Sequence, residues 1–222
     1  TPDKYGDLET MLRVQSWIGP VIHHMKMEEL TESGQIVPAN IFILPMTAVP
    51  ITDTYQEEVQ LGIINNPYRN ATITAIASYY AETDTGPVVV LCERIEHGEK
   101  LAEKLECPFI NGKTPSARRE KVWEGIRGGS INLVVLSTIA DEGLDLPNLS
   151  YLILAGGGKA SHKAIQRIGR GLRSSEGKSE LFVFDMMDQG KYLRKHSLNR
   201  KATYLAEPAY QVVETSVEEV LS

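Results

Sequence analysis

From Gly86 onward, short runs of β-branched and other apolar residues alternate with amphipathic segments of helix length. This alternation restricts the fold more than any other feature, because strands that alternate with helices return to one sheet in parallel. It predicts an α/β fold whose mostly parallel sheet has helices on both faces. The expected strands span residues 87–92, 108–111, 131–137, 151–156 and 180–186, and the expected helices include residues 97–106 and 115–129.

The rest of the chain has a less regular pattern. Helical periodicity marks residues 8–19, 26–33, 54–66 and 68–82, with a strand at 40–45, a basic helix after residue 190, and a strand near 210–215. A proline at position 67 separates the last two of the N-terminal helices. The chain ends in a short acidic tail.

Charge and cysteine content restrict the class of protein. The net charge of −6 argues against general nucleic-acid binding, but residues 159–201 contain eleven Lys or Arg against four Asp or Glu, which predicts a local basic face. The longest apolar runs are far below the roughly 18 residues that span a bilayer. Two cysteines, Cys92 and Cys107, are too few for a disulfide framework. We therefore expect a cytoplasmic protein with reduced thiols, in the host cytoplasm if the gene is viral.

The segment AGGGKAS, residues 155–161, has the composition of a phosphate-binding loop between a strand and a helix. Its spacing does not fit the P-loop pattern G-x-x-x-x-G-K-[ST]. The first glycine would fall on Ile153 and the hydroxyl residue on Ala160. ATP binding by this loop is therefore a disfavoured alternative, and the segment is expected to act as the turn into the next helix, with glycines that let that helix approach a neighbouring domain.

The next segment, QRIGRGLR at residues 166–173, predicts a helix with two stripes. An apolar stripe that includes Leu172 would pack against the domain. The second stripe presents Gln166, Arg170 and Arg173, whose amide and two planar guanidiniums suit a phosphate with several charged oxygens. The alternative is a solvated basic helix face, but a glycine inside the helix, which costs about 1 kcal/mol against alanine, favours close approach by a ligand.

Three further loops follow expected strands, where open parallel sheets bind ligands. After the strand at 131–137, a Thr138 hydroxyl could hold a phosphate, while Gly143 and Asp145 could reach a nucleotide; the alternative is an Asp that satisfies its own backbone. After the strand at 87–92, Arg94 and His97 are candidate phosphate contacts, although His97 could equally be a first-turn helix residue without a ligand. The third loop contains an Asn-Gly turn at 111 and 112.

These segments together resemble conserved motifs of superfamily 2 helicases and translocases of the DEAD/DEAH type, in particular phage and repair enzymes. QRIGRGLR resembles motif VI, STIADEGLDLPNL (137–149) resembles motif V, and VVVLCERIEHGEKL (88–101) resembles motif IV. Gly112, with Arg119 seven residues later, matches the register of a further block of the family. Two positions depart from the common pattern: Asn111 stands where many members have His, and Ile126 where many have Phe.

The resemblance implies a RecA-like fold for residues 37–222, the second motor domain, with residues 1–36 as connecting helices. It implies catalytic roles for Arg170, Arg173 and Gln166 at the ATP γ-phosphate, nucleotide contacts for Gly143 and Asp145, and nucleic-acid contacts for Thr138, Arg94, His97 and Gly112. It also implies that the substrate is DNA, single-stranded or branched. We expect no membrane partner.

The 222 residues contain neither a P-loop nor a D-E-x-[HD] box. ATP with Mg²⁺ would therefore be held mainly by a preceding RecA-like domain of the same protein, and this chain alone is not expected to hydrolyse ATP. The first residues, Thr1 and Pro2, fit the end of the S-A-T-P motif that closes the first motor domain, which suggests a piece of a longer protein. The alternatives are a motor domain of a restriction-type enzyme and a non-catalytic nucleic-acid-binding module.

Overall fold

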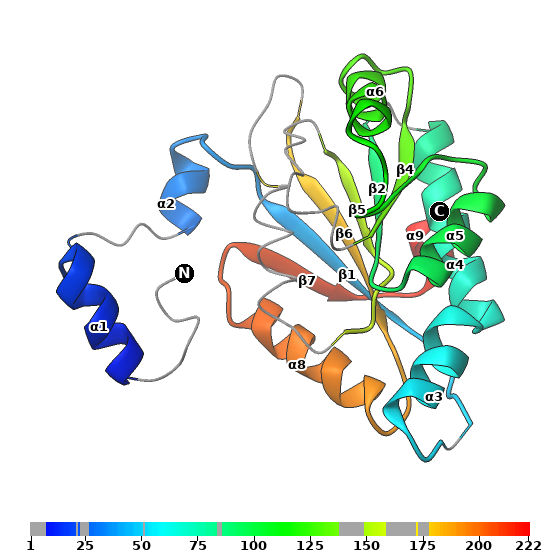
Figure 1. Ribbon diagram of the computed structural model, residues 1–222, viewed down its shortest axis with the longest axis horizontal. Coiled ribbons are helices and arrows are strands. Elements are labelled where there is room, and N and C mark those ends of the chain that lie inside the picture. Colours follow the sequence, from blue (N-terminus) through cyan, green and yellow to red (C-terminus); the bar gives the residue numbers. More distant parts are fainter. Residues whose placement is uncertain are drawn as a thin grey trace.

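A computed structural model shows a seven-stranded sheet in which every described strand pair is parallel (Figure 1). The strand order is β3-β4-β2-β5-β6-β1-β7. The prediction of an α/β fold with a mostly parallel sheet is confirmed. The structure describes residues 8–20, 22, 27–50, 52–83, 86–137, 149–158, 172 and 178–222. The strands are β1 (Ala39–Pro45), β2 (Val88–Cys92), β3 (Phe109–Ile110), β4 (Leu133–Ser137), β5 (Tyr151–Leu154), β6 (Leu181–Met187) and β7 (Tyr210–Glu214).

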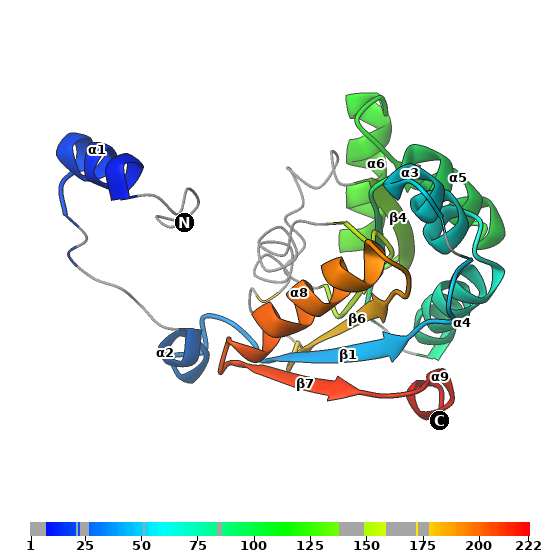
Figure 2. The same ribbon diagram turned by 90° about the horizontal axis from the view of Figure 1, so that it is seen from below.

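Helices cover both faces of this sheet, and α1 lies apart from it in both views (Figures 1 and 2). One apolar core cluster joins the sheet to α6 and α8, and the other joins the opposite face to α4 and α5. The helices are α1 (Leu8–Ile18), α2 (Met27–Glu32), α3 (Tyr55–Val59), the π-helix η2 (Gln60–Ile64), α4 (Pro67–Thr83), α5 (Ile95–Lys104), α6 (Ser116–Arg127), α8 (Leu193–Leu205) and α9 (Val217–Val220). No described helix is long and apolar enough to cross a membrane.

Successive side chains along each strand point to opposite faces of the sheet, so each strand contributes residues to both cores. In β2, a central strand whose five residues are all buried, Val89 and Leu91 belong to the core under α6 and α8. Val88, Val90 and Cys92 belong to the core under α4 and α5. A continuous apolar run is what a strand covered on both faces requires, so the run PVVVLC is explained by its central position.

The expected strands occur within two residues of the predicted bounds, and most helices match as well. Residues 54–66 differ, because the predicted single helix continues after α3 as the π-helix η2. The acidic tail also contains more structure than expected. Ser216 and Glu219 form a capping box for the single turn α9, since each side chain accepts from the other's backbone N–H.

Candidate nucleotide and nucleic-acid site

The carboxyl ends of the parallel strands place two of the predicted site residues along one edge of the sheet. Arg94 follows β2, and Gly112 follows β3. Because β4 lies between these two strands, the two loops are about 10 Å apart at the ordinary strand spacing. The sheet thus brings these loops to one edge without bringing the two residues into contact.

The other predicted site residues lie outside the described part of the chain: Gln166, Arg170, Arg173, Gly143, Asp145 and Thr138. Their roles stay predictions. One neighbour is described: Leu172 is 2% exposed and belongs to the core cluster under α6 and α8. Its carbonyl accepts a hydrogen bond of 2.8 Å from the backbone N–H of Val37. The expectation that Leu172 packs into the domain is confirmed.

Arg94 is exposed and occupies the N-cap position of α5 with an extended backbone. It lines an open groove of about 880 Å³ between α3, η2 and the start of α5. The same groove is lined by three carboxylates, from Asp53, Glu57 and Glu96. A nucleic-acid phosphate that met Arg94 here would also meet these carboxylates. Contact of Arg94 with nucleic acid stays a prediction.

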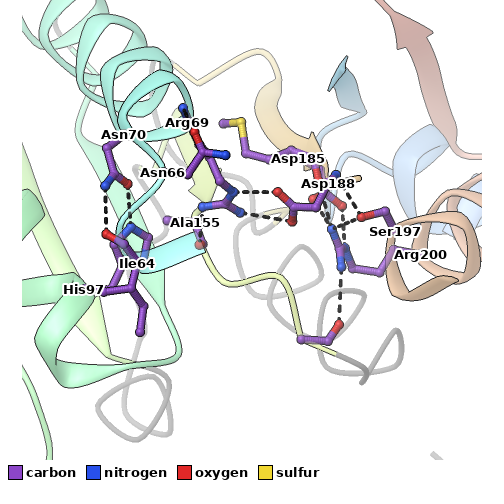
Figure 3. Close-up of polar contacts among 12 residues, drawn as sticks. Ile64, Asn66, Arg69, Asn70, His97, Ala155, Asp185, Asp188, Ser197 and Arg200 are labelled. Atoms are coloured by element: carbon purple, nitrogen blue, oxygen red, sulfur yellow. Dashed lines mark hydrogen bonds and ion pairs between the residues drawn. The ribbon is translucent and has the colours of Figure 1, made fainter. Parts of the chain in front are cut away.

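His97 is fully buried, and this corrects its assignment as a nucleic-acid contact. Its exposed fraction is 0%, and its Nε2 lies 2.8 Å from Oδ1 of Asn70. Because Nδ2 of Asn70 donates to the carbonyl of Ile64, Oδ1 must accept, and Nε2 of His97 carries the proton. A ring buried in this way does not reach a phosphate on the surface. His97 instead joins α5 to the start of α4 (Figure 3).

The environment of His97 predicts a stability that depends on pH. Burial, and then the charges of Arg69 and Lys100, lower the pKa of His97 to about 3. In the unfolded chain the pKa is near its ordinary value, so below about pH 6.5 the unfolded state binds a proton that the folded state does not. The free energy of unfolding should therefore fall by about 2 kcal/mol from pH 7 to pH 5 because of this residue.

Urea denaturation of the chain and of His97→Gln at both pH values measures this contribution. Glutamine can still donate to Asn70 but does not titrate. The stability advantage of the natural residue over glutamine should shrink by about 2 kcal/mol on acidification. A difference that is independent of pH would contradict the assignment of a neutral, buried ring.

Gly112 is exposed in a turn that closes on itself. Oδ1 of Asn111 accepts from the backbone N–H of Lys113 at 2.9 Å, and the backbone N–H of Asn111 donates to Oγ1 of Thr114 at 3.0 Å. Asn111 thus forms hydrogen bonds with backbone and side-chain groups of its own turn, as asparagine commonly does in turns. Contact of Gly112 with nucleic acid stays a prediction.

Two buried ion pairs lie at the same edge of the sheet, and the sequence motifs did not indicate them (Figure 3). Arg69 of α4 donates from Nε to Oδ1 of Asp188 at 2.6 Å. Arg200 of α8 contacts Asp185 of β6 through two hydrogen bonds of 2.8 Å. The sequence feature that could have indicated one of these pairs is the carboxylate of Asp185 inside the apolar strand LFVFDMM, because a buried charge requires a partner.

The Asp185 pair includes a third group. The hydroxyl of Tyr204 donates to Oδ2 of Asp185 at 2.8 Å. Burial, followed by the charge of Asp185, raises the pKa of Tyr204 well above its ordinary value. The phenol therefore remains protonated and serves as a donor.

A third buried carboxylate, Glu58, caps the N-terminus of α8. It is 1% exposed and accepts from the backbone N–H groups of Lys191, Tyr192 and Leu193 at 3.1, 2.8 and 2.7 Å. The first N–H groups of a helix have no partner within the helix, and a carboxylate satisfies them and interacts favourably with the helix dipole. Glu58 thereby ties the end of α3 to the start of the helix that carries Arg200.

The glycines at 156–158 pack closely against side chains of this domain, and their part in the approach of a second domain stays a prediction. A Cβ at Gly157 would lie 2.8 Å from Oδ2 of Asp188, and a Cβ at Gly158 would overlap the carboxylate of Glu93. A carboxylate against this glycine segment repels a phosphate. The geometry therefore agrees with the failed P-loop spacing.

The basic stretch near the C-terminus is partly internal. Arg200 is 4% exposed, and Lys201 is paired with Glu214 of β7. Arg194 and Lys195 are exposed on α8. A basic face in this part of the chain is thus smaller than the count of residues suggested.

Solved structures of superfamily 2 helicases share this fold. The crystal structure of phage T4 UvsW aligns with a TM-score of 0.63 at 21% identity, covering 82% of this chain and 42% of that one. Saccharomyces cerevisiae Dbp5 bound to RNA and ADP BeF3 aligns with a TM-score of 0.60 at 13% identity, covering 97% and 53%. At these identities the likeness shows the fold alone, which is that of the RecA-like domains of this class.

The sequence comparisons find similarity to helicases over part of the chain. Residues 71–175 match the model described as the helicase conserved C-terminal domain. The chain is 32% identical over 136 residues to the putative DNA 3'-5' helicase Rad25 of Halobacterium salinarum, covering 61% of this chain. Residues 71–175 are therefore similar to the helicase conserved C-terminal domain. The chain spans 22% of the length of this Halobacterium salinarum relative.

Proposed function

We propose that this chain is the C-terminal motor domain of an ATP-dependent DNA helicase or translocase. In this proposal a preceding RecA-like domain of the same protein holds most of the ATP and its Mg²⁺, which supply the reactive phosphoanhydride and its charge-neutralising metal. The present chain contributes residues that complete the site when the two domains close. The division into connecting helices at 1–36 and a motor domain at 37–222 belongs to the same proposal.

The arginines of QRIGRGLR have the central catalytic role. On closure, Arg170 and Arg173 would donate hydrogen bonds to the oxygens of the transferred phosphoryl group, and Gln166 would contact the same group. Guanidiniums placed where charge develops stabilise the transition state by about 10³- to 10⁵-fold in rate. Gly143 and Asp145 would contact the nucleotide from the neighbouring loop.

The nucleic-acid track would run along the loops after the strands. Thr138, Arg94 and Gly112 are the proposed contacts to backbone phosphates, and His97 is not among them because it is buried. Binding of ATP to the closed form and release after hydrolysis would alternate the two domains between states with different affinity for the track. Such a difference in affinity is what couples hydrolysis to movement.

This proposal rests on the observation that both segments resembling motor motifs lie within the region that matches the helicase C-terminal model. The segments at 137–149 and 166–173 both fall inside residues 71–175, which match the helicase C-terminal model. The names of the relatives support DNA as the substrate, since they include DNA 3'-5' helicases from archaea and an ATP-dependent DNA helicase of phage T4.

Steady-state ATP hydrolysis by the full-length protein tests the proposal. Single-stranded DNA, forked DNA and RNA of equal length are added as separate stimulators. We expect DNA to raise the rate by at least about tenfold over the protein alone, and RNA to raise it less. Tight binding of all three with no stimulation would favour the non-catalytic module and overturn the motor proposal.

A further inference from the structure

Two buried arginines from opposite faces of the sheet each hold one end of the segment Ala155–Gly158. Nη1 of Arg69, on α4, donates to the carbonyl of Ala155 at 2.8 Å. Nη1 of Arg200, on α8, donates to the carbonyl of Gly158 at 3.3 Å. Figure 3 shows both guanidiniums reaching toward the segment that follows β5.

The chemistry of these contacts requires arginine. Each guanidinium uses Nε and Nη2 for its carboxylate, which leaves Nη1 for a backbone carbonyl. A planar fork can make both contacts in one fixed geometry, whereas the ammonium of lysine is a point charge on a flexible stem. The carboxylates neutralise the buried charge, and the third contact is therefore available for positioning the chain.

The segment between the two carbonyls is also restricted from other sides. The backbone N–H of Gly156 donates to the carbonyl of Leu91 at 3.1 Å. A Cβ at Gly157 would meet Ile63 of η2 and Asp188, and one at Gly158 would meet Glu93. The path of the chain as it leaves β5 is thus determined by side chains from η2, α4, α8 and the loop after β2.

We propose that Arg69 and Arg200 are positioning residues for the phosphate-contacting arginines. Gln166 follows Gly158 by only eight positions in the sequence, so in this proposal the direction in which the chain leaves β5 restricts where Gln166 and the two arginines can lie. The two guanidiniums act through the carbonyls of Ala155 and Gly158 and do not touch the nucleotide. The catalytic part of this inference rests on the proposed function. The structural part, that the two guanidiniums hold the segment after β5, rests on the contacts alone.

Amide hydrogen exchange of the 222-residue chain tests the structural part. Arg200→Lys and Arg69→Lys keep the charge and remove the fork. In either variant we expect amides in peptides that start at Ala155 to exchange about tenfold faster, with β2 and β4 unchanged. The matched control is Tyr204→Phe, which removes a hydrogen bond to Asp185 and leaves the contact of Arg200 with Gly158 intact.

Equal exchange in the lysine variants and in Tyr204→Phe would overturn the proposal, as would acceleration spread over the whole domain. Two lysine variants are used because either one alone could unfold the domain. Arg69 and Arg200 hold different ends of the segment, so one folded variant is sufficient for the measurement.

The kinetic constants of the full-length protein test the catalytic part. For Arg200→Lys we expect kcat of DNA-stimulated ATP hydrolysis to fall about 10- to 100-fold, because small misplacements of catalytic groups have effects of this size. The KM for ATP should change by less than about twofold, since ATP is held mainly by the other domain. Tyr204→Phe should leave both constants within about twofold.

A fall in kcat that is equal in both variants would indicate a purely structural role. Failure of the proposed function gives a different pattern: turnover then does not depend on Arg170, while hydrogen exchange still reports whether the two guanidiniums hold the segment.

Discussion

Replacing Arg170 by alanine in the full-length protein should lower DNA-stimulated ATP hydrolysis by about 10³-fold or more, the loss typical of a missing arginine finger. The reason is that the guanidinium would stabilise charge on the transferred phosphoryl group only in the transition state. Binding of ATP should be almost unchanged, because the ground state makes its main contacts elsewhere. Steady-state turnover and titration with a fluorescent ATP analogue measure the two quantities separately.

Arg13→Ala is the matched control for the loss of one guanidinium. Arg13 lies on α1, its side chain is 76% exposed, and its partner is Glu9 four residues earlier. An exposed pair of this kind contributes at most about 1 kcal/mol, so the turnover of this variant should equal that of the natural protein. Unchanged turnover in Arg170→Ala would refute the assignment of QRIGRGLR as the phosphate-contacting helix.

Removal of the Asp188 carboxylate by substitution with alanine should lower the free energy of unfolding by about 3–5 kcal/mol. The side chains of Arg69 and Asp188 are 0% and 2% exposed, so the variant would leave a guanidinium buried without its carboxylate. The loss approaches half the total stability of an ordinary domain. Urea denaturation of the 222-residue chain, followed by circular dichroism, measures it.

The exposed pair of Glu120 and Arg127 provides the comparison, since it has the same chemistry at 61% and 50% exposure. Glu120→Ala should cost less than about 1 kcal/mol. A second variant, Arg69→Met combined with Asp188→Leu, removes both charges and should recover part of the loss of Asp188→Ala, although the carbonyl of Ala155 then lacks its donor. Equal losses for Asp188→Ala and Glu120→Ala would contradict the burial of the first pair.

The sequence by itself determined the class of fold and the order of its elements. Runs such as PVVVLC and INLVVL alternate with helical periods, and this local pattern requires a parallel sheet with two covered faces. The same local information predicted the motor motifs, because the spacing within QRIGRGLR and STIADEGLDLPNL is contained in short stretches of chain. The packing of Leu172 followed from helical periodicity alone.

Tertiary structure decided the roles of residues whose partners are distant in sequence. His97 has a motif-like position after β2, but its burial against Asn70 depends on how α5 meets α4. Arg69 and Asp188 are 119 residues apart, so no local pattern could pair them. The glycines after β5 have the composition of a phosphate loop, yet Glu93 and Asp188 occupy the space beside them. Local sequence encodes periodicity and turn chemistry, whereas burial and charge pairing arise only when distant segments meet.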